Sequence, residues 1–214
     1  MKLFLRKYFP IIIVLISTVM IFSFVNNVSA EENLAVGKVT IIAENFCGKT
    51  LEEWKELDAN IIIGTEGNDK IKGTNGIDVI LGLGGNDRIQ GKDGDDCLVG
   101  GEGNDRILGE NGDDIIFGNN GKDRLHGAKG NDIINAGDGE DRVSGNSGND
   151  NLFGNSGNDI LEGSSGNDSL DGGEDFDDCK GGSGNNQLVN CEGKPPKNDD
   201  KKEKDDNKQY KEDN

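Results

Sequence analysis

Residues 82–117 read GLGGNDRIQ, GKDGDDCLV, GGEGNDRIL and GENGDDIIF, four consecutive nine-residue units that follow one pattern. The pattern extends from Gly64 to Val189 as fourteen units without an insertion. Glycine occupies position 1 in thirteen units and position 4 in thirteen, Asp occupies position 6 in thirteen, and position 8 is apolar in all fourteen. A nine-residue unit cannot bury its single apolar side chain alone, so we predict stacked units that share one core.

Each conserved position of the repeat suggests a physical role. Glycines at positions 1 and 4 are expected to adopt positive φ and to turn the chain tightly. The Asp at position 6 brings an oxygen ligand to the turn, and the residue at position 8 is the inward-facing centre of a short strand.

These units resemble the RTX, or hemolysin-type, calcium-binding nonapeptide GGxGxDxUx. The resemblance implies an all-β fold, a right-handed parallel β-roll in which two units form one 18-residue coil, with Ca²⁺ held between turns. Fourteen units would then make about seven coils. Position 2 departs from the family pattern because it is Gly in only four units, which we expect to relax the turn without affecting the carboxylates.

The resemblance also implies the metal ligands. In the family arrangement, the Asp residues of units n and n+2 share a site together with loop carbonyls, and such oxygen ligands suit Ca²⁺. The thirteen candidates, which form eleven such pairs, are Asp69, Asp78, Asp87, Asp96, Asp105, Asp114, Asp123, Asp132, Asp141, Asp150, Asp159, Asp168 and Asp177. Stacked carboxylates repel without the metal, so several Ca²⁺ ions are predicted as the cofactor that folds the repeats.

Composition excludes several classes of function. The chain has 214 residues, 34 Gly, 5% aromatic residues and a formal charge of −18. Such an acidic chain is not expected to bind nucleic acid through phosphate attraction. His126 is the single histidine, and about 33 residues between a leader and the repeats are too few for a catalytic domain, so we predict no enzyme.

The two ends of the sequence differ from the repeats. Residues 1–30 combine basic residues, an apolar run and a Val28-Ser29-Ala30 cleavage pattern, which predicts a secretory signal peptide; an uncleaved membrane anchor is the alternative. We predict a cap segment at 31–63, the β-roll at 64–193 and a disordered charged tail at 194–214. After cleavage the chain would have no stable membrane span and would be secreted or at the cell surface.

Reading the repeat every 18 residues separates two outward faces. Odd units place a basic ladder at position 7, consisting of Lys70, Arg88, Arg106, Arg124 and Arg142. Even units place an apolar stripe at positions 7 and 9, consisting of Val79, Leu81, Cys97, Val99, Ile115, Phe117, Ile133 and Phe153. The ladder either softens the acidic edge or binds an anionic glycan or other polyanion. The stripe indicates a covered or partner-binding surface.

A short helix and the cysteines point to a cover for this stripe. Thr50 and Glu53 form a capping-box pattern that opens TLEEWKEL, whose Leu51, Trp54 and Leu57 would share a face. Four cysteines allow three pairings. We favour Cys47–Cys97, which would fasten the helical cap over the stripe, and Cys179–Cys191, which would close the last coil.

Two functions remain open from the sequence. The first is a secreted calcium-binding structural or cell-surface protein whose repeats fold on binding several Ca²⁺ ions. The alternative is a calcium-dependent adhesion or glycan-binding module. It would use the arginines of the ladder or the exposed part of the stripe near Ile133 and Phe153, with a surface glycan or another surface protein as partner.

Overall fold

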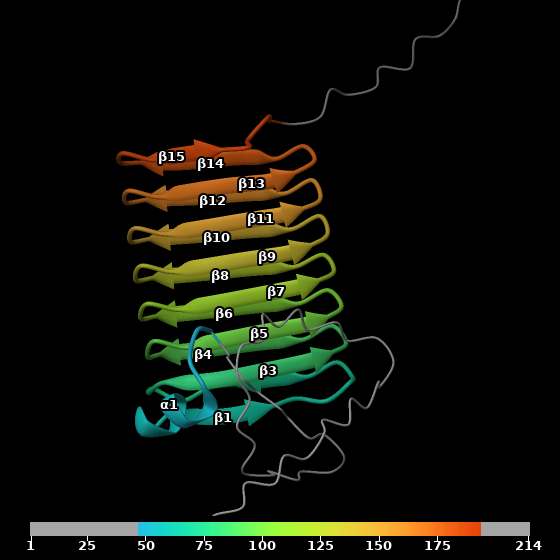
Figure 1. Ribbon diagram of the computed structural model, residues 1–214, viewed down its shortest axis with the longest axis vertical. Helices are drawn as coiled ribbons and strands as arrows, with labels where there is room; N and C mark the ends of the chain where they lie inside the picture. The colour runs from blue at the N-terminus through green and yellow to red at the C-terminus, as the bar shows by residue number, and fades with distance from the viewer. Residues whose placement is uncertain (1–46, 194–214) are drawn as a thin grey trace, which may run out of the picture.

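The computed structural model describes residues 47–193 as one long stack of parallel strands (Figure 1). The predicted signal peptide, the first part of the predicted cap segment and the predicted tail lie outside the described residues. Within residues 47–193, none of the helical structure is long and apolar enough to cross a bilayer. The single helix described, α1 (Leu51–Glu56), lies beside the first strands, and the last coil lies at the opposite end of the stack.

The strands form two parallel sheets that face each other. Strands from even units, with one strand ahead of them, form an eight-stranded sheet in the order β1 (Asn60–Ile63), β3 (Asp78–Gly84), β5 (Cys97–Glu102), β7 (Ile115–Asn120), β9 (Ile133–Asp138), β11 (Asn151–Ser156), β13 (Ser169–Glu174) and β15 (Gln187–Val189). Strands from odd units form a seven-stranded sheet in the order β14 (Asp178–Ser183), β12 (Ile160–Ser165), β10 (Arg142–Ser147), β8 (Arg124–Lys129), β6 (Arg106–Asn111), β4 (Arg88–Asp93) and β2 (Lys70–Lys72).

The register repeats every 18 residues, because Arg88 pairs with Arg106 in one sheet and Cys97 pairs with Ile115 in the other. Consecutive units therefore alternate between the sheets, and two units complete one coil. The predicted all-β parallel roll of about seven coils is confirmed.

The core is a single row of position-8 side chains between the sheets. Its buried members are Ile71, Ile80, Ile89, Leu98, Ile107, Ile116, Leu125, Ile134, Val143, Leu152, Leu161 and Leu170. A typical strand runs from position 7 through position 3 of the next unit, and position 1 also faces inward. The strands are thus longer than the sequence suggested, and Ala136, the one non-glycine at position 1, lies fully buried in the core.

The turns differ from the expectation for glycine. Positive φ occurs at position 4, as in Gly121 (φ 138°), but also at position 2 rather than at position 1. From unit 3 onward every position-2 residue has positive φ, including Lys92 (98°) and Glu110 (89°). The missing position-2 glycines therefore do not relax the turn, since the neighbouring coils hold even bulky side chains in this disfavoured region.

Limited space favours glycine at position 1, although Ala136 occupies this position in one unit. A methyl group on Gly109 would lie 2.0 Å from the Asp114 carboxylate oxygen Oδ2 and 2.8 Å from the Gly127 carbonyl oxygen. Position 1 therefore brings the backbone close to the position-6 carboxylate, and at Gly109 a side chain would obstruct this approach.

Helix α1 forms as the sequence indicated. Thr50 and Glu53 make both hydrogen bonds of a capping box. Trp54 is only 3% exposed and packs with Val79 and Cys97 at the start of the apolar stripe. Leu57, however, is 45% exposed and does not share this contact, because the helix ends at Glu56 and Leu57 is already its C-terminal cap.

Both favoured disulfides are present. Cys47–Cys97 fastens the segment before α1 to β5, and Cys179–Cys191 joins β14 to the residues that follow β15. The helix and first disulfide cover only the beginning of the stripe, because Ile133 and Phe153 remain 41% and 37% exposed.

Candidate metal centres

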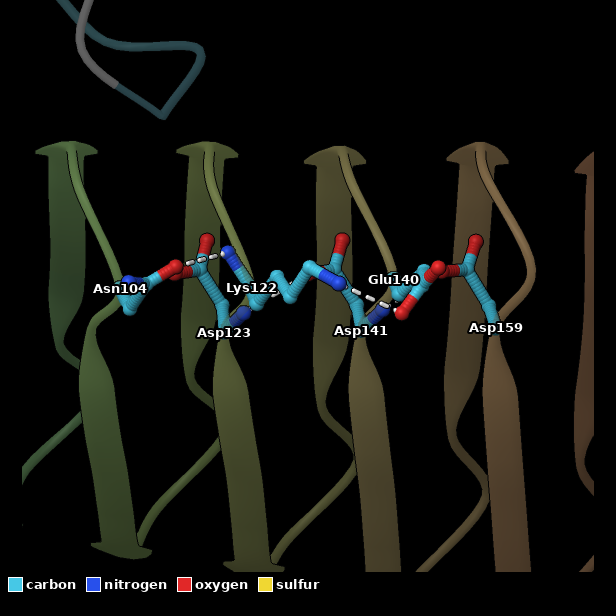
Figure 2. A network of polar contacts seen from close by, with 6 residues as sticks. All are labelled: Asn104, Lys122, Asp123, Glu140, Asp141 and Asp159. Atoms are coloured by element: carbon cyan, nitrogen blue, oxygen red, sulfur yellow. Dashed lines mark hydrogen bonds and ion pairs between the residues drawn. The ribbon is translucent and has the colours of Figure 1, made fainter.

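The position-6 aspartates line the two long edges of the roll, where the chain passes from one sheet to the other. Each Asp immediately precedes a strand, except Asp78, which is the first residue of β3, so residues 18 apart lie on neighbouring coils of the same edge. Figure 2 shows Asp123, Asp141 and Asp159 projecting from successive coils in the same orientation. The Asp123 backbone N–H donates to Asp141 Oδ1 at 2.8 Å, and the Asp141 N–H donates to Asp159 Oδ1 at 2.8 Å.

The same bond joins all eleven predicted Asp pairs. The donor and acceptor residues are Asp69 and Asp87, Asp78 and Asp96, Asp87 and Asp105, Asp96 and Asp114, Asp105 and Asp123, Asp114 and Asp132, Asp123 and Asp141, Asp132 and Asp150, Asp141 and Asp159, Asp150 and Asp168, and Asp159 and Asp177. In each pair, Oδ1 of the later Asp therefore accepts a hydrogen bond that holds the previous coil in register.

The second oxygen of these carboxylates, Oδ2, is buried and receives no hydrogen bond from the described part of the chain. This holds for Asp87, Asp96, Asp105, Asp114, Asp123, Asp132, Asp141, Asp150, Asp159, Asp168 and Asp177. Buried acceptors are normally satisfied, so eleven equivalent orphans at one position of a repeat indicate a missing positive partner.

The first two aspartates of the series are different. Asp69 Oδ2 accepts the Thr65 backbone N–H at 2.6 Å, and Asp78 Oδ2 accepts the Thr74 N–H at 2.6 Å. Both threonine hydroxyls also donate to these oxygens. Thr65 and Thr74 are the two position-2 residues without positive φ, so their N–H groups turn toward the carboxylate. Asp69 and Asp78 are therefore already satisfied by protein donors.

Eight of the eleven orphan oxygens share their surroundings with a backbone carbonyl oxygen of the next coil. A methyl group on Gly91 would meet Asp96 Oδ2 at 2.3 Å and the carbonyl oxygen of Gly109 at 2.9 Å. Asp96 belongs to the same unit as Gly91, whereas Gly109 lies one coil further along. Two acceptor oxygens from adjacent coils thus converge on the same small space, an arrangement that a cation stabilises.

Burial raises the free-energy cost of ionising these carboxylates. Loss of solvation, together with the smaller effect of the neighbouring Asp132 and Asp96 carboxylates, raises the pKa of Asp114 to about 8, although the hydrogen bond from the Asp96 N–H opposes the shift. The same cause raises the pKa of Asp96 to about 7 and that of Asp105 to about 6. At neutral pH these groups require either a proton or a cation.

The donor set fits a hard divalent cation. Carboxylate and carbonyl oxygens are the ligands that Ca²⁺ prefers, in flexible sets of six or more. Among residues 47–193, no three acidic, histidine or cysteine side chains gather closely enough to hold a metal by themselves. Any ion at these edges therefore needs backbone oxygens as well as the carboxylate, which the convergence at position 1 supplies.

A second side-chain ladder, at position 5, was missed by the sequence reasoning. The Asn104 backbone N–H donates to Asn86 Oδ1 at 2.7 Å, and the Lys122 N–H donates to Asn104 Oδ1 at 2.7 Å. Lys122 in turn pairs with Glu140, as Figure 2 shows. Position 5 is Asn or Asp in ten of the fourteen units, which was the available signal. This ladder fixes the spacing of the turns that carry the aspartates.

The predicted partner residues also occupy the predicted faces. Lys70, Arg88, Arg106, Arg124 and Arg142 pair directly along the seven-stranded sheet and are exposed. Ile133 and Phe153 lie on the eight-stranded sheet. The structure therefore separates a basic face from an apolar face.

The fold and its buried carboxylate edges define a cation-binding parallel β-roll. The family model of the RTX calcium-binding nonapeptide repeat (4 copies) matches residues 63–96, 72–107, 90–125, 117–152 and 153–188. These segments cover more than half of the 214 residues, and the chain belongs to this family of calcium-binding repeats. No curated protein matches the chain.

Proposed function

We propose that this chain is a secreted structural module of the cell surface whose coils fold when Ca²⁺ fills the edges of the roll. The observation that carries the proposal is the set of eleven buried Oδ2 atoms that lack a hydrogen-bond partner within residues 47–193. Membership of the calcium-binding family identifies the ion.

The free-energy cost of these unpaired oxygens supports a coupling between metal binding and folding. Leaving one buried acceptor unsatisfied costs about 1–3 kcal/mol, and more when it is charged. Eleven such oxygens would cost on the order of 10–30 kcal/mol, which exceeds the net stability of about 5–15 kcal/mol of ordinary domains. The roll is therefore not expected to persist at neutral pH without a compensating ion.

Asp87 through Asp177 would supply the carboxylate ligands, and position-1 carbonyls would add ligands from the next coil. Bound Ca²⁺ would supply the positive charge that these oxygens lack. The chain's own contribution is to present the oxygens on stacked turns, held by the Asp and Asn ladders and by the two disulfides.

The expected location follows from the same chemistry. Both disulfides persist in oxidising compartments outside the cytoplasm, where Ca²⁺ is also abundant. The secretory leader predicted at residues 1–30 supports this placement. We assign the chain no catalytic role, because the described residues are occupied by the repeat, α1 and the cysteine-linked segments.

Circular dichroism and sedimentation of residues 31–214 would test the proposal. The chain should be expanded and without β structure in chelator, and should become compact and β-rich on addition of Ca²⁺. Mg²⁺ should be a poor substitute because it demands stricter octahedral geometry. A full β signal in chelator at neutral pH, or none at saturating Ca²⁺, would contradict the coupling of calcium binding to folding.

A further inference from the structure

Positive charge in the strands is concentrated on one face of the roll. The first five strands of the seven-stranded sheet, β2, β4, β6, β8 and β10, carry eight cationic residues and two acidic ones. The cations are Lys70, Lys72, Arg88, Lys92, Arg106, Arg124, Lys129 and Arg142. The strands of the eight-stranded sheet contain no Lys or Arg. A chain of net charge −18 therefore presents a locally basic surface.

The basic ladder at position 7 is continuous. Each of its five residues pairs directly with the next along the sheet, from Lys70 to Arg142. Neighbouring strands lie about 4.8 Å apart, so the row is roughly 19 Å long. Like charges placed directly opposite each other destabilise a sheet unless they are compensated.

Within the described chain the ladder receives only partial compensation, because Glu140 interacts electrostatically with Arg142 but no residue of the ladder forms an ion pair. Within residues 47–193, the ion pairs are Lys55–Glu52 and Lys122–Glu140, and neither involves the ladder. Glu110 lies on the same sheet, but its carboxylate accepts a hydrogen bond from the Gln90 amide. The ladder therefore keeps unpaired donors directed at solvent.

The N-terminal half of the ladder also borders a hollow in the surface. Lys70, Lys72, Arg88 and Arg106 line this hollow, together with Gln90 and Leu108. Four cations around one depression offer an anionic group more than one donor at once.

We propose that the basic ladder binds a linear acidic polysaccharide laid along the stack, with its carboxylate or sulfate groups opposite successive arginines. Charge complementarity and the straight row of cations favour an extended, regularly charged polymer. The inference rests on the proposed function, because only a folded roll brings residues 18 apart into register. Binding therefore requires Ca²⁺.

Two other occupants fit less well. A single nucleic-acid strand is normally held by aromatic stacking as well as charge, and these five strands contain no Phe, Tyr or Trp. The chain's own segment 194–214 contains seven Lys and seven Asp or Glu, so it has no net charge to complement the ladder.

The test compares residues 31–214 as wild type, as Arg106→Gln/Arg124→Gln and as the matched control Lys55→Gln/Lys180→Gln. Both double variants lose two positive charges, but Lys55 lies on α1, beside the eight-stranded sheet, and Lys180 lies on β14, beyond the last strand of the ladder. Binding to hyaluronate, heparin, uncharged dextran and duplex DNA is measured by titration in Ca²⁺ and in chelator. The first two probes distinguish carboxylate from sulfate recognition.

Hyaluronate, heparin or both should bind in Ca²⁺, weaken with added salt and lose about tenfold in affinity in the arginine variant, while the control stays within about twofold. Equal losses in both variants, dextran binding as tight as that of the acidic polymers, or tighter binding to DNA would overturn the assignment. If wild type folds in Ca²⁺ by circular dichroism but binds neither acidic polymer, this inference fails and the proposed function stands. Failure to fold in Ca²⁺ refutes the proposed function itself.

Discussion

The substitution Asp114→Asn distinguishes two roles of this residue, because an amide can keep the hydrogen bond between coils but cannot supply the negative charge of a metal ligand. Asp114 Oδ1 accepts the Asp96 N–H at 2.9 Å, whereas Oδ2 is buried without a partner in the described chain. The repeat itself shows that an amide fits here. Asn186 occupies the same position in the last unit, where its Oδ1 accepts the Asp168 N–H at 2.8 Å and its Nδ2 donates to the Gly182 carbonyl at 3.3 Å.

The substitution should have opposite effects in the two ionic conditions. Without Ca²⁺ it removes a buried, unpaired carboxylate and should stabilise the coils by at least about 1 kcal/mol. With Ca²⁺ it should remove one ion. A site filled at a hundredfold excess over its dissociation constant contributes about 2.7 kcal/mol to stability, and Asp114→Asn should lose that increment.

Urea unfolding at a series of Ca²⁺ concentrations measures both effects. The slope of the logarithm of the unfolding constant against the logarithm of the Ca²⁺ concentration counts the ions released on unfolding. This slope should fall by about one in Asp114→Asn, and equilibrium dialysis should find one fewer bound ion. At the lowest Ca²⁺ concentrations the variant should retain more β structure than wild type.

Asp78→Asn is the matched control. Both Asp78 oxygens already accept hydrogen bonds, from Asn60 Nδ2 at 2.6 Å and from the Thr74 N–H at 2.6 Å. An amide there should lose a bond and destabilise the roll by about 1–3 kcal/mol, without changing the Ca²⁺ slope. If Asp114→Asn behaves as Asp78→Asn does, with an unchanged slope, the assignment of Asp114 as a calcium ligand is refuted.

Three further predictions concern the same turns. In chelator the raised folded-state pKa values, about 6 to 8 across several aspartates, mean that the folded coils bind more protons than the unfolded chain; β structure should increase as pH falls from about 8 to about 4. In Ca²⁺ the roll should be β-rich at neutral pH, and the stabilisation that Ca²⁺ adds should shrink as pH falls, because protons compete with the ions for the carboxylates. Urea unfolding in Ca²⁺ and circular dichroism in chelator across this pH range measure the two effects. A constant calcium-dependent stabilisation would contradict the competition, and no gain of β structure on acidification in chelator would contradict the raised pKa values. Gly109→Ala should destabilise the calcium-bound roll by about 1–3 kcal/mol in urea unfolding, because its methyl would lie 2.0 Å from Asp114 Oδ2; an unchanged midpoint would remove the steric explanation. Ala128→Gly should stabilise it by about 1 kcal/mol, since Ala128 has a φ of 91°, and a lower unfolding midpoint would show that this backbone is unstrained.

Features that depend only on periodicity were predictable from the sequence. Apolar residues at position 8 predict a one-row core, and the 18-residue coil that the family resemblance implies places Arg88 beside Arg106. The Cys47–Cys97 pairing was favoured among three because Cys97 lies on the apolar stripe and Cys47 lies just before the helix, and the structure contains this disulfide. These conclusions need no knowledge of backbone angles, since the repeat fixes which residues are neighbours.

Features that depend on the direction of single peptide groups were not predictable. Glycine tolerates both signs of φ. Its presence at position 1 therefore could not show whether the backbone there needs a positive φ or needs room for the neighbouring carboxylate. Asp69 and Asp114 look equivalent in sequence, but the Thr65 N–H satisfies only the first. Strand β1 was missed because it precedes the glycine pattern, although Ile61 pairs with Val79 in the register of the repeat.

The direction of single peptide groups also explains which aspartates in the series have an unpaired Oδ2. An ion held between two coils needs oxygens from both, so a carboxylate beyond the last complete turn would be buried without sufficient ligands. At the first turns, the N–H groups of Thr65 and Thr74 satisfy the aspartates instead. At the far end of one edge Asn186 replaces Asp, and at the other the carbonyl of Asn190 takes the place of a position-1 carbonyl against Gly172. The chain thus places its unpaired negative charge only where two coils can surround a cation, which is the distribution expected if calcium, rather than general acidity, determines the positions of these carboxylates.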